Sequence, residues 1–154
     1  IWLTLHPEKT KMIDLNSKRG GPGRSFDFLG FTHFLSKSRK GNLVLQRKTS
    51  SKRLTRAIKT ISHFIKLNRH LKLRDLIAAI NIKLRGHYSY YGITFNAKGI
   101  SLFYEQVKRS LYKWLNRKGG KPKWKWGTFS RLVEQWYPLV KPFIAHPYVP
   151  SRRI

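Results

Sequence analysis

Apolar side chains recur at helical spacing in the second part of the chain. Residues 54–65, 73–84 and 100–114 each place Leu, Ile, Val or aromatic side chains three or four positions apart. Such spacing lines one face of an α-helix, so each segment predicts an amphipathic helix. A shorter segment, 129–136, stops before Pro138, and the proline-rich remainder is expected to be irregular.

Residues beside these segments indicate where the helices begin and end. The Thr and Ser residues at positions 49–51 precede the first helix and offer hydroxyl groups for its N-cap. Gly86 follows the second segment and is predicted to end that helix. Gly119 and Gly120 stand where the third helix should end.

The beginning of the chain has a different pattern. Segments 2–5, 11–15 and 26–35 are short apolar or alternating runs between Gly-rich and polar stretches, which is typical of strands. Residues 36–42 have turn composition and precede another apolar run, so residues 26–45 predict a β-hairpin. The expected fold is therefore mainly α, with N-terminal strands, a three-helix bundle, a short fourth helix and an irregular tail.

The charge of the chain is strongly positive. It contains 33 Lys and Arg against 6 Asp and Glu, a formal net charge of +27. Because that much like charge opposes the compact state, a polyanionic partner is expected. Nucleic acid fits best, since each phosphate that Lys or Arg neutralises releases a condensed counterion. An anionic membrane surface is the main alternative.

Other features narrow the class of protein. The chain has no Cys, so disulfides, thiolate metal sites and Cys nucleophiles are excluded. Its six His lie far apart, and no apolar run approaches the roughly 20 residues of a transmembrane helix. The N-terminus shows no secretion signal. We expect an intracellular protein and, because the chain begins at Ile1 and its one Met is Met12, a fragment whose start lies upstream.

Several segments resemble one protein family. Leu5–Met12 (LHPEKTKM), followed by Phe26–Phe31 (FDFLGF), resembles the last two palm blocks of reverse transcriptases encoded by group II introns. Ile80–Gly92 (INIKLRGHYSYYG), continued by Leu111–Lys118 (LYKWLNRK), resembles the maturase-specific domain of the same proteins, also called domain X. The tail Tyr137–Pro147 resembles family members that end soon after this domain.

This resemblance implies two domains and their partners. Residues 1–47 would be the end of the reverse transcriptase palm, and residues 48–154 the thumb-like maturase-specific domain. Such a domain binds group II intron RNA and stabilises its folded, splicing-competent form, while the ribozyme performs the chemistry. In a complete enzyme it also holds the template–primer duplex beside the rest of the palm and fingers. The implied location is a bacterial cytoplasm or an organelle, with no membrane role.

The palm-like part contains two candidate sites. Lys9 matches a lysine of the palm's penultimate block, and the resemblance implies a general acid near the incoming nucleotide; the alternative is a solvated lysine beside Glu8. Phe28, Gly30 and Phe31 resemble the primer-grip hairpin, in which Gly30 lets backbone pass close to a nucleic-acid strand. The alternative there is an ordinary buried strand with a bulge.

A tyrosine-rich segment is the next candidate, predicted to lie just past the end of the second helix. Arg85, Tyr88, Tyr90 and Tyr91 could stack on unpaired bases of RNA. The alternative is that two of the three tyrosines pack the junction between helices. His87 stands where an aromatic residue is common in the family.

Cations also concentrate around the third helix and the loop after it. Glu105 is the one acid between Asp75 and Glu134, so binding to a nucleic-acid backbone is preferred over a merely solvated face. Trp114 lies on the apolar stripe and is expected in the core, whereas two later tryptophans are candidates for base stacking. The candidate contacts are Lys113, Arg117, Lys118, Lys121, Lys123, Trp124, Lys125 and Trp126.

No catalytic site is expected in this chain alone. Polymerisation requires carboxylates that hold two metal ions, and the family's Tyr-x-Asp-Asp motif is absent, with Asp14, Asp27 and Asp75 scattered. We expect no cofactor for the chain itself and Mg²⁺ only in a complete polymerase. Two alternatives stay open: a C-terminal fragment of an RNA-directed DNA polymerase whose catalytic aspartates lie upstream, and a structural RNA-binding protein of the ribosomal kind.

Overall fold

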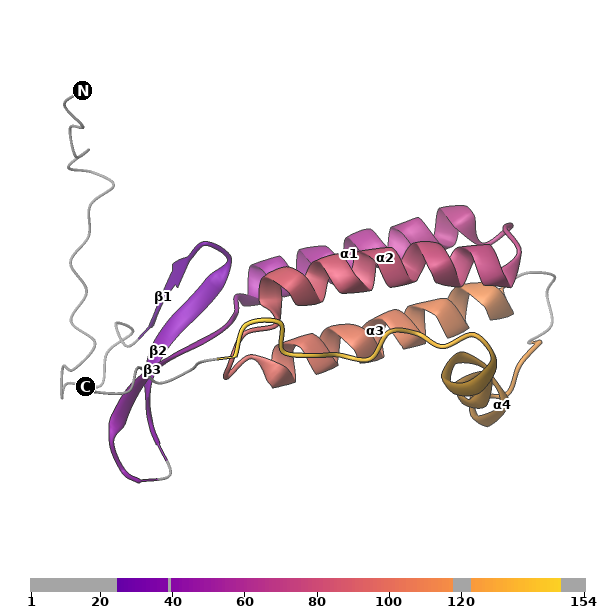
Figure 1. The fold of residues 1–154 in the computed structure, drawn as a ribbon. Coiled ribbons are helices and arrows are strands. Elements are labelled where there is room, and N and C mark those ends of the chain that lie inside the picture. The colour runs from indigo at the N-terminus through magenta and orange to yellow at the C-terminus, as the bar shows by residue number, and fades with distance from the viewer. Residues whose placement is uncertain (1–24, 39, 118–122, 148–154) are drawn as a thin grey trace, which may run out of the picture. The chain divides into compact units, whose positions relative to one another are not determined.

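The computed structural model describes residues 25–38, 40–117 and 123–147 (Figure 1). The chain divides into two compact units, Ile1–Lys48 and Thr49–Ile154. Outside the described residues lie the predicted strands 2–5 and 11–15, the glycines predicted to end the third helix, and the candidate residues Lys9, Lys118 and Lys121.

A three-stranded antiparallel sheet precedes the helices, in the order β1-β2-β3. Its strands are β1 Ser25–Phe28, β2 Phe31–Lys37 and β3 Leu43–Thr49. The turn predicted between β2 and β3 is confirmed: the backbone N–H of Ser38 donates to the carbonyl of Asn42 at 2.8 Å. The Ser38 hydroxyl also accepts from the backbone N–H of Asn42 at 3.1 Å, which closes the turn.

The prediction of one continuous strand over residues 26–35 was wrong. Phe28 pairs with Phe31 across a two-residue turn in which Leu29 and Gly30 have φ values of 49° and 83°. Consecutive positive φ values suit the twist of a two-residue hairpin, and glycine adopts them at no steric cost. The sequence pattern did not predict this turn because aromatic residues flank it on both sides. The apolar pattern of a strand therefore continues across the turn without interruption.

Three long helices and two short helical segments follow, which confirms the predicted mainly α fold. The long helices are α1 Ser51–Asn68, α2 Leu73–Tyr91 and α3 Ala97–Asn116. The short segments are α4 Trp126–Arg131 and the π-helical η2 Leu132–Trp136. At the predicted start of α1, Ser50 occupies the N-cap position, although its side chain makes no capping hydrogen bond.

Gly86 does not end the second helix, contrary to the prediction. A Cβ atom at Gly86 would meet nothing within 4 Å, and α2 continues to Tyr91. The helix ends at Gly92, where a Cβ would lie 2.3 Å from the Tyr88 carbonyl oxygen and 2.6 Å from that of Phe143. Tyr88 keeps the apolar spacing going beyond Gly86, so tertiary packing outweighs the cost of one helical glycine, about 1 kcal/mol.

The core of the second unit lies between the three long helices, each of which contacts the other two. Figure 1 shows these helices side by side, with α4 below the C-terminal part of α3. Burying one aliphatic side chain completely stabilises the fold by about 1.5–3 kcal/mol. The most deeply buried apolar side chains are Ile65, Leu76, Ile80, Leu84, Tyr88, Ile100, Val107, Leu111, Phe129 and Val133.

Asn96 holds the two helix junctions at one end of this bundle together. Its fully buried side-chain amide donates to the Thr49 hydroxyl at 2.8 Å and to the Tyr91 carbonyl at 2.7 Å. Its Oδ1 accepts from the Thr49 backbone N–H at 2.9 Å. The start of α1, the end of α2 and the start of α3 are thereby fixed to one side chain.

The tail after η2 is irregular, as predicted, and runs along α2. Asn81 donates to the Pro138 carbonyl and accepts from the Val140 N–H, both at 2.9 Å. Further along, the Tyr88 hydroxyl donates to the Val140 carbonyl at 3.2 Å, and the His146 N–H donates to the Gly92 carbonyl at 2.8 Å. These bonds supply partners for backbone that has no regular structure of its own.

Candidate nucleic-acid interface

Four cationic side chains surround the ring of Trp114. The Nζ atoms of Lys66 and Lys113 lie 5.5 and 5.3 Å from the ring centroid. The guanidinium carbons of Arg69 and Arg117 lie 6.0 and 5.3 Å from it. Each distance falls in the range of a cation–π interaction. We call these five residues the Trp114 cluster.

The local structure of the helix ends explains this gathering of charge. Lys66 lies in the last turn of α1 and Lys113 in the last turn of α3, where the negative end of the helix dipole favours cations. The indole N–H of Trp114 donates to the Ser62 hydroxyl at 3.1 Å, which orients the ring. Trp114 was predicted to lie in the core; it packs against the core but is only half-buried.

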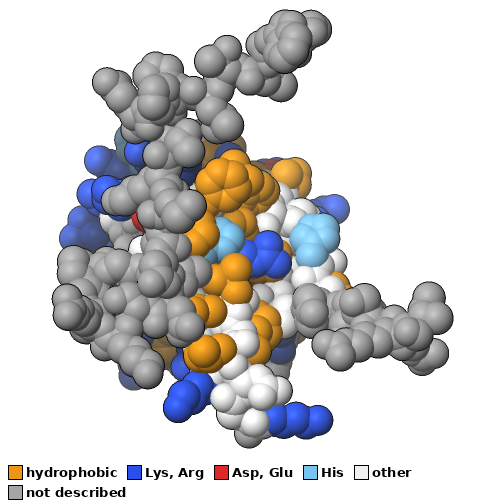
Figure 2. Space-filling model, turned by 90° about the vertical axis from the view of Figure 1, so that its left-hand side faces the viewer, with side chains coloured by type: hydrophobic (Ala, Val, Ile, Leu, Met, Phe, Trp, Pro, Cys, Tyr) orange, Lys and Arg blue, Asp and Glu red, His pale blue; other side chains and the backbone are white. Residues whose placement is uncertain are grey.

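The charges of the Trp114 cluster have no carboxylate partner within the described residues. Over residues 25–38, 40–117 and 123–147, the one ion pair joins Lys108 to Glu134 at 2.7 Å. Glu134 is therefore engaged by Lys108 and not by the Trp114 cluster. Hydrogen bonds from Lys108 and the Ser130 hydroxyl hold the pKa of Glu134 below its usual range. Figure 2 views the molecule from the side on which α1 begins, away from the Trp114 cluster, and there too Lys and Arg side chains are visible while acidic ones are scarcely seen.

A hollow of about 430 Å³, which we call the basic groove, lies beside the Trp114 cluster and shares Arg69 with it. Its cationic members come from the α1–α2 connection and from the segment before α4. Because both features contain Arg69, they form one continuous basic surface at this end of the bundle. The basic groove is lined by Arg69, Leu71, Lys72, Leu73, Leu115, Lys123 and Trp124.

The backbone at Trp124 is firmly held against the end of α3. The Asn116 side chain accepts from the Trp124 N–H at 2.9 Å and donates to its carbonyl at 3.0 Å. The Tyr112 hydroxyl donates to the same carbonyl at 3.1 Å, and the Lys123 Nζ lies 5.3 Å from the Trp124 ring centroid. The segment predicted to bind RNA thus presents its charge and ring from a fixed position.

Two other predicted contacts lie outside the basic groove. Trp126 is the first residue of α4, not part of a loop, and 41% of it is exposed. Its ring packs edge-on against Tyr112 with centroids 5.0 Å apart, and the Nζ of Lys108 lies 5.6 Å from its centroid. Lys125 is the N-cap residue of α4 and is exposed.

The tyrosine-rich segment lies within the last turns of α2, not past its end as predicted. Tyr88 is fully buried, and burial raises the pKa of its hydroxyl well above the usual value. Tyr91 is half-buried with its ring 4.6 Å from that of His87. Tyr90 is 52% exposed, and Arg85 is exposed. Helical spacing therefore places Tyr88 and Tyr91 toward the core and Tyr90 toward solvent.

The helical unit matches a known protein family. The family model for the group II intron, maturase-specific domain matches residues 51–132, which is more than half of the chain. The match begins with α1 and reaches the first residue of η2. The chain belongs to this family. Neither the curated proteins nor the solved structures that were compared with it include a match.

The maturase-specific domain places residues in its basic surface that the sequence interpretation missed. Lys66, Arg69 and Lys72 join the predicted Lys113, Arg117 and Lys123 there. The missed residues follow the first apolar segment at three-residue intervals, with Lys66 in α1, Arg69 at its C-cap and Lys72 at the N-cap of α2. Continuing the helical spacing past Ile65 could have found Lys66 and Arg69. The sequence could not predict that they lie close to Lys113, because α2 separates α1 from α3 along the chain.

A second basic hollow of about 390 Å³ lies between the long helices of the maturase-specific domain. Arg53 and Arg56 of α1 and Lys83 of α2 line it, together with His87 and Phe103. The rings of His87 and Phe103 are stacked, with centroids 3.7 Å apart and planes 17° apart. Burial lowers the pKa of His87 to about 4, so this imidazole is neutral at neutral pH.

The primer-grip candidates lie around the first turn of the sheet. Phe31 is 8% exposed and Phe28 is 58% exposed, with Gly30 in the turn between them. Among the described residues, no group of three or more His, Asp or Glu side chains is arranged to hold a metal ion. In the same part of the chain, no helix has the length and apolar character needed to cross a bilayer.

Proposed function

We propose that the maturase-specific domain binds the folded RNA of a group II intron and stabilises its splicing-competent form. Membership of the maturase family supports this proposal. The observation that carries it is the Trp114 cluster, four cations around one indole with no described carboxylate partner. Such a surface gains free energy from a polyanion because each neutralised phosphate releases counterions.

The basic surface suits structured RNA in two ways. Lys and Arg side chains from the ends of α1 and α3 can contact phosphates on either side of a groove, which is how double-stranded RNA is read by shape. Trp124, held by Asn116 and Tyr112, offers a ring to unpaired bases beside them. A rigid surface loses little conformational entropy when it binds, so little of the free energy of its contacts is offset by ordering.

For the sheet, we propose the role of the end of a reverse transcriptase palm, with residues 1–47 as that domain and 48–154 as the thumb. The tight turn at Leu29 and Gly30 supports this, because it places a glycine backbone at the tip of the hairpin. The proposed partners of this part are the template–primer duplex and the remaining palm and fingers, with Lys9 near the incoming nucleotide. The proposed location is a bacterial cytoplasm or an organelle.

The test of intron binding compares two charge-matched variants of the full chain. The first replaces Lys66, Arg69, Lys113 and Arg117 by Gln, and the second replaces the exposed residues Lys52, Lys59, Lys98 and Lys141 by Gln. Affinity is measured by fluorescence anisotropy at moderate salt, with a panel of group II intron RNAs and an unrelated structured RNA of equal length.

We expect the unchanged chain to bind at least one intron RNA more tightly than the unrelated RNA. The first variant should lose about tenfold or more in affinity for that intron, and the second markedly less, because only the first removes clustered phosphate contacts. Circular dichroism should show both variants folded, since the replaced side chains are at the surface. Equal binding of intron and unrelated RNA would contradict a maturase function, and equal losses in the two variants would place the interface elsewhere.

A further inference from the structure

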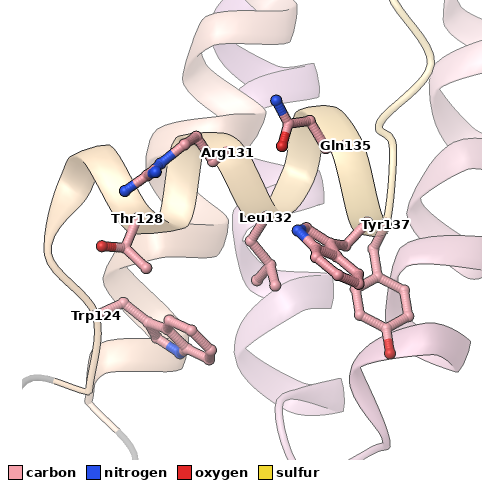
Figure 3. Close-up of a pocket in the computed structure, with 7 residues that line it drawn as sticks. Trp124, Thr128, Arg131, Leu132, Gln135 and Tyr137 are labelled. Atoms are coloured by element: carbon pink, nitrogen blue, oxygen red, sulfur yellow. The ribbon is translucent and has the colours of Figure 1, made fainter.

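A hollow of about 640 Å³ opens beside α4 and η2 (Figure 3). Leu132 lies between the rings of Trp124 and Tyr137 in this view. The rim combines three aromatic rings with three hydrogen-bonding side chains. We call this hollow the aromatic groove; it is lined by Trp124, Thr128, Arg131, Leu132, Gln135, Trp136 and Tyr137.

The aromatic groove presents large apolar rings to solvent. Trp136 is 76% exposed and Tyr137 is 37% exposed, and both are adjacent in the chain. Exposed aromatic rings gathered around one hollow mark a surface that a partner covers. Trp136 is the most exposed of the large hydrophobic side chains among the described residues.

The π-helical geometry of η2 determines where these rings lie. The Tyr137 N–H donates to the Leu132 carbonyl at 2.9 Å, so one residue more than in an α-helical turn separates donor and acceptor. This extra residue turns Trp136 and Tyr137 toward the side of α4 that carries Thr128 and Arg131, with which they line the groove. Isolated π-helical turns of this kind are frequent at functional sites.

The backbone beside the aromatic groove is fixed on both sides. Val133 is fully buried, and the Leu139 N–H donates to its carbonyl at 3.0 Å. Asn81 then holds the carbonyl of Pro138 and the N–H of Val140. The exposed rings are therefore presented by an ordered chain, which lowers the entropic cost of binding.

The polar groups of the aromatic groove fit a nucleotide rather than an apolar peptide. Its charged side chain is Arg131, and no carboxylate lines it. Glu134, the nearest acid in the chain, instead accepts hydrogen bonds from Lys108 and Ser130. Thr128 and Gln135 each carry donor and acceptor atoms of the kind that read a base edge.

We propose that the aromatic groove holds an unpaired nucleotide of the bound RNA, with its base stacked on Trp136 and its phosphate beside Arg131. This inference rests on the proposed function, because it assigns a subsite to the same RNA. Continuity supports it: Trp124 lines both the aromatic groove and the basic groove. The family match ends at Leu132, so Gln135, Trp136 and Tyr137 lie beyond the matched segment.

The test measures two RNA probes with variants of the full chain. One probe is a single-stranded 12-nucleotide oligomer of mixed sequence, and the other is a blunt RNA duplex of equal total charge. The variants are Trp136→Ala, Trp136→Phe and the control Ile82→Ala, which removes a side chain that is 68% exposed on α2. Affinity is measured by anisotropy, and quenching of tryptophan fluorescence reports stacking.

We expect Trp136→Ala to weaken single-strand binding by about 5- to 150-fold, the range for loss of one stacked base, and duplex binding by less than twofold. Trp136→Phe should restore most of the single-strand affinity, and Ile82→Ala should change neither. An unchanged single-strand affinity in Trp136→Ala, with duplex binding intact, overturns the nucleotide pocket, leaves the proposed function standing and assigns the groove to another class of partner. Equal losses for the two probes, or no binding of the single strand by the unchanged chain, overturn the pocket alone. Failure of the unchanged chain to bind any intron RNA in the test of the proposed function overturns both proposals.

Discussion

His87 is a residue whose charge is decided by burial. Its ring is stacked on Phe103, and its Nε2 atom is buried without a hydrogen-bond partner among the described residues. A buried imidazolium with no acceptor would be costly, so the neutral form is favoured and the pKa falls to about 4 from 6.5. At neutral pH the ring behaves as an uncharged aromatic residue stacked on Phe103.

This shift predicts a pH dependence of stability. Between pH values of about 6.5 and about 4, the unfolded chain binds a proton at His87 that the folded chain does not. The free energy of unfolding should therefore fall as the pH is lowered through this window, by about 1–2 kcal/mol after allowance for partial exposure of the ring. Urea unfolding at several pH values measures it.

Substitution separates His87 from the other titrating groups. His87→Phe should flatten the decline between the two pH values, because the ring can still stack on Phe103 but no longer binds a proton. His63→Gln, at an exposed position of α1, should leave the decline as it is. A decline of equal size in His87→Phe would contradict the assignment.

At the scale of elements, short polar anchors hold the irregular tail on α2. Asn81 acts as both donor and acceptor to the backbone around Pro138 and Val140. Gly92 allows the tail to pass close to the end of the helix, since any Cβ there would clash with the Phe143 carbonyl. The same tail carries the backbone that follows Trp136 and Tyr137, so these anchors also support the aromatic groove.

Asn81→Ala should loosen the tail without unfolding the bundle. The substitution leaves the Val140 N–H and the Pro138 carbonyl without their partner, which costs about 1–3 kcal/mol. Hydrogen exchange should become faster at the amides of Val140 and His146 and stay slow in the core of α3. Asn68→Ala is a matched control, because Asn68 donates only to the Phe64 carbonyl within α1. Unchanged exchange at Val140 in Asn81→Ala would show that the tail is held by other contacts.

At the scale of the whole molecule, charge repulsion opposes a compact fold. The chain carries 33 basic and 6 acidic residues, and one ion pair is present in the part that the structure describes. Salt shortens the range of repulsion, from a Debye length of about 10 Å at 0.1 M to about 3 Å at 1 M. The proposed RNA partner would screen the same charges more effectively, because it would bind where they are concentrated.

The chain should therefore be more stable at high salt. Between 0.05 and 0.5 M sodium chloride, we expect Tm to rise by about 4 °C or more, the shift that corresponds to about 1 kcal/mol in a domain of this size class. Differential scanning calorimetry measures the change. A constant or falling Tm would contradict the view that repulsion limits stability.

Sequence pattern predicted the three long helices well because helical spacing is a local property. Residues 54–65, 73–84 and 100–114 each lie inside one helix of the structure. The errors occurred where a boundary depends on distant contacts: α2 passes Gly86 because Tyr88 packs into the core and bonds to the tail. The two-residue turn at Leu29 and Gly30 was missed because apolar residues continue on both sides of it.

By itself the sequence determined the charge and the fold class of the protein: its positive charge follows from residue types, and its three long helices follow from their spacing. Tertiary structure alone decided which of these charges act together. Lys66 and Lys113 meet at Trp114 because α1 and α3 end on the same side of the bundle, and Trp124 and Tyr137 line one groove with the π-helical turn that follows α4. Helical spacing defines the faces of one helix, whereas the packing of several helices decides which faces become neighbours.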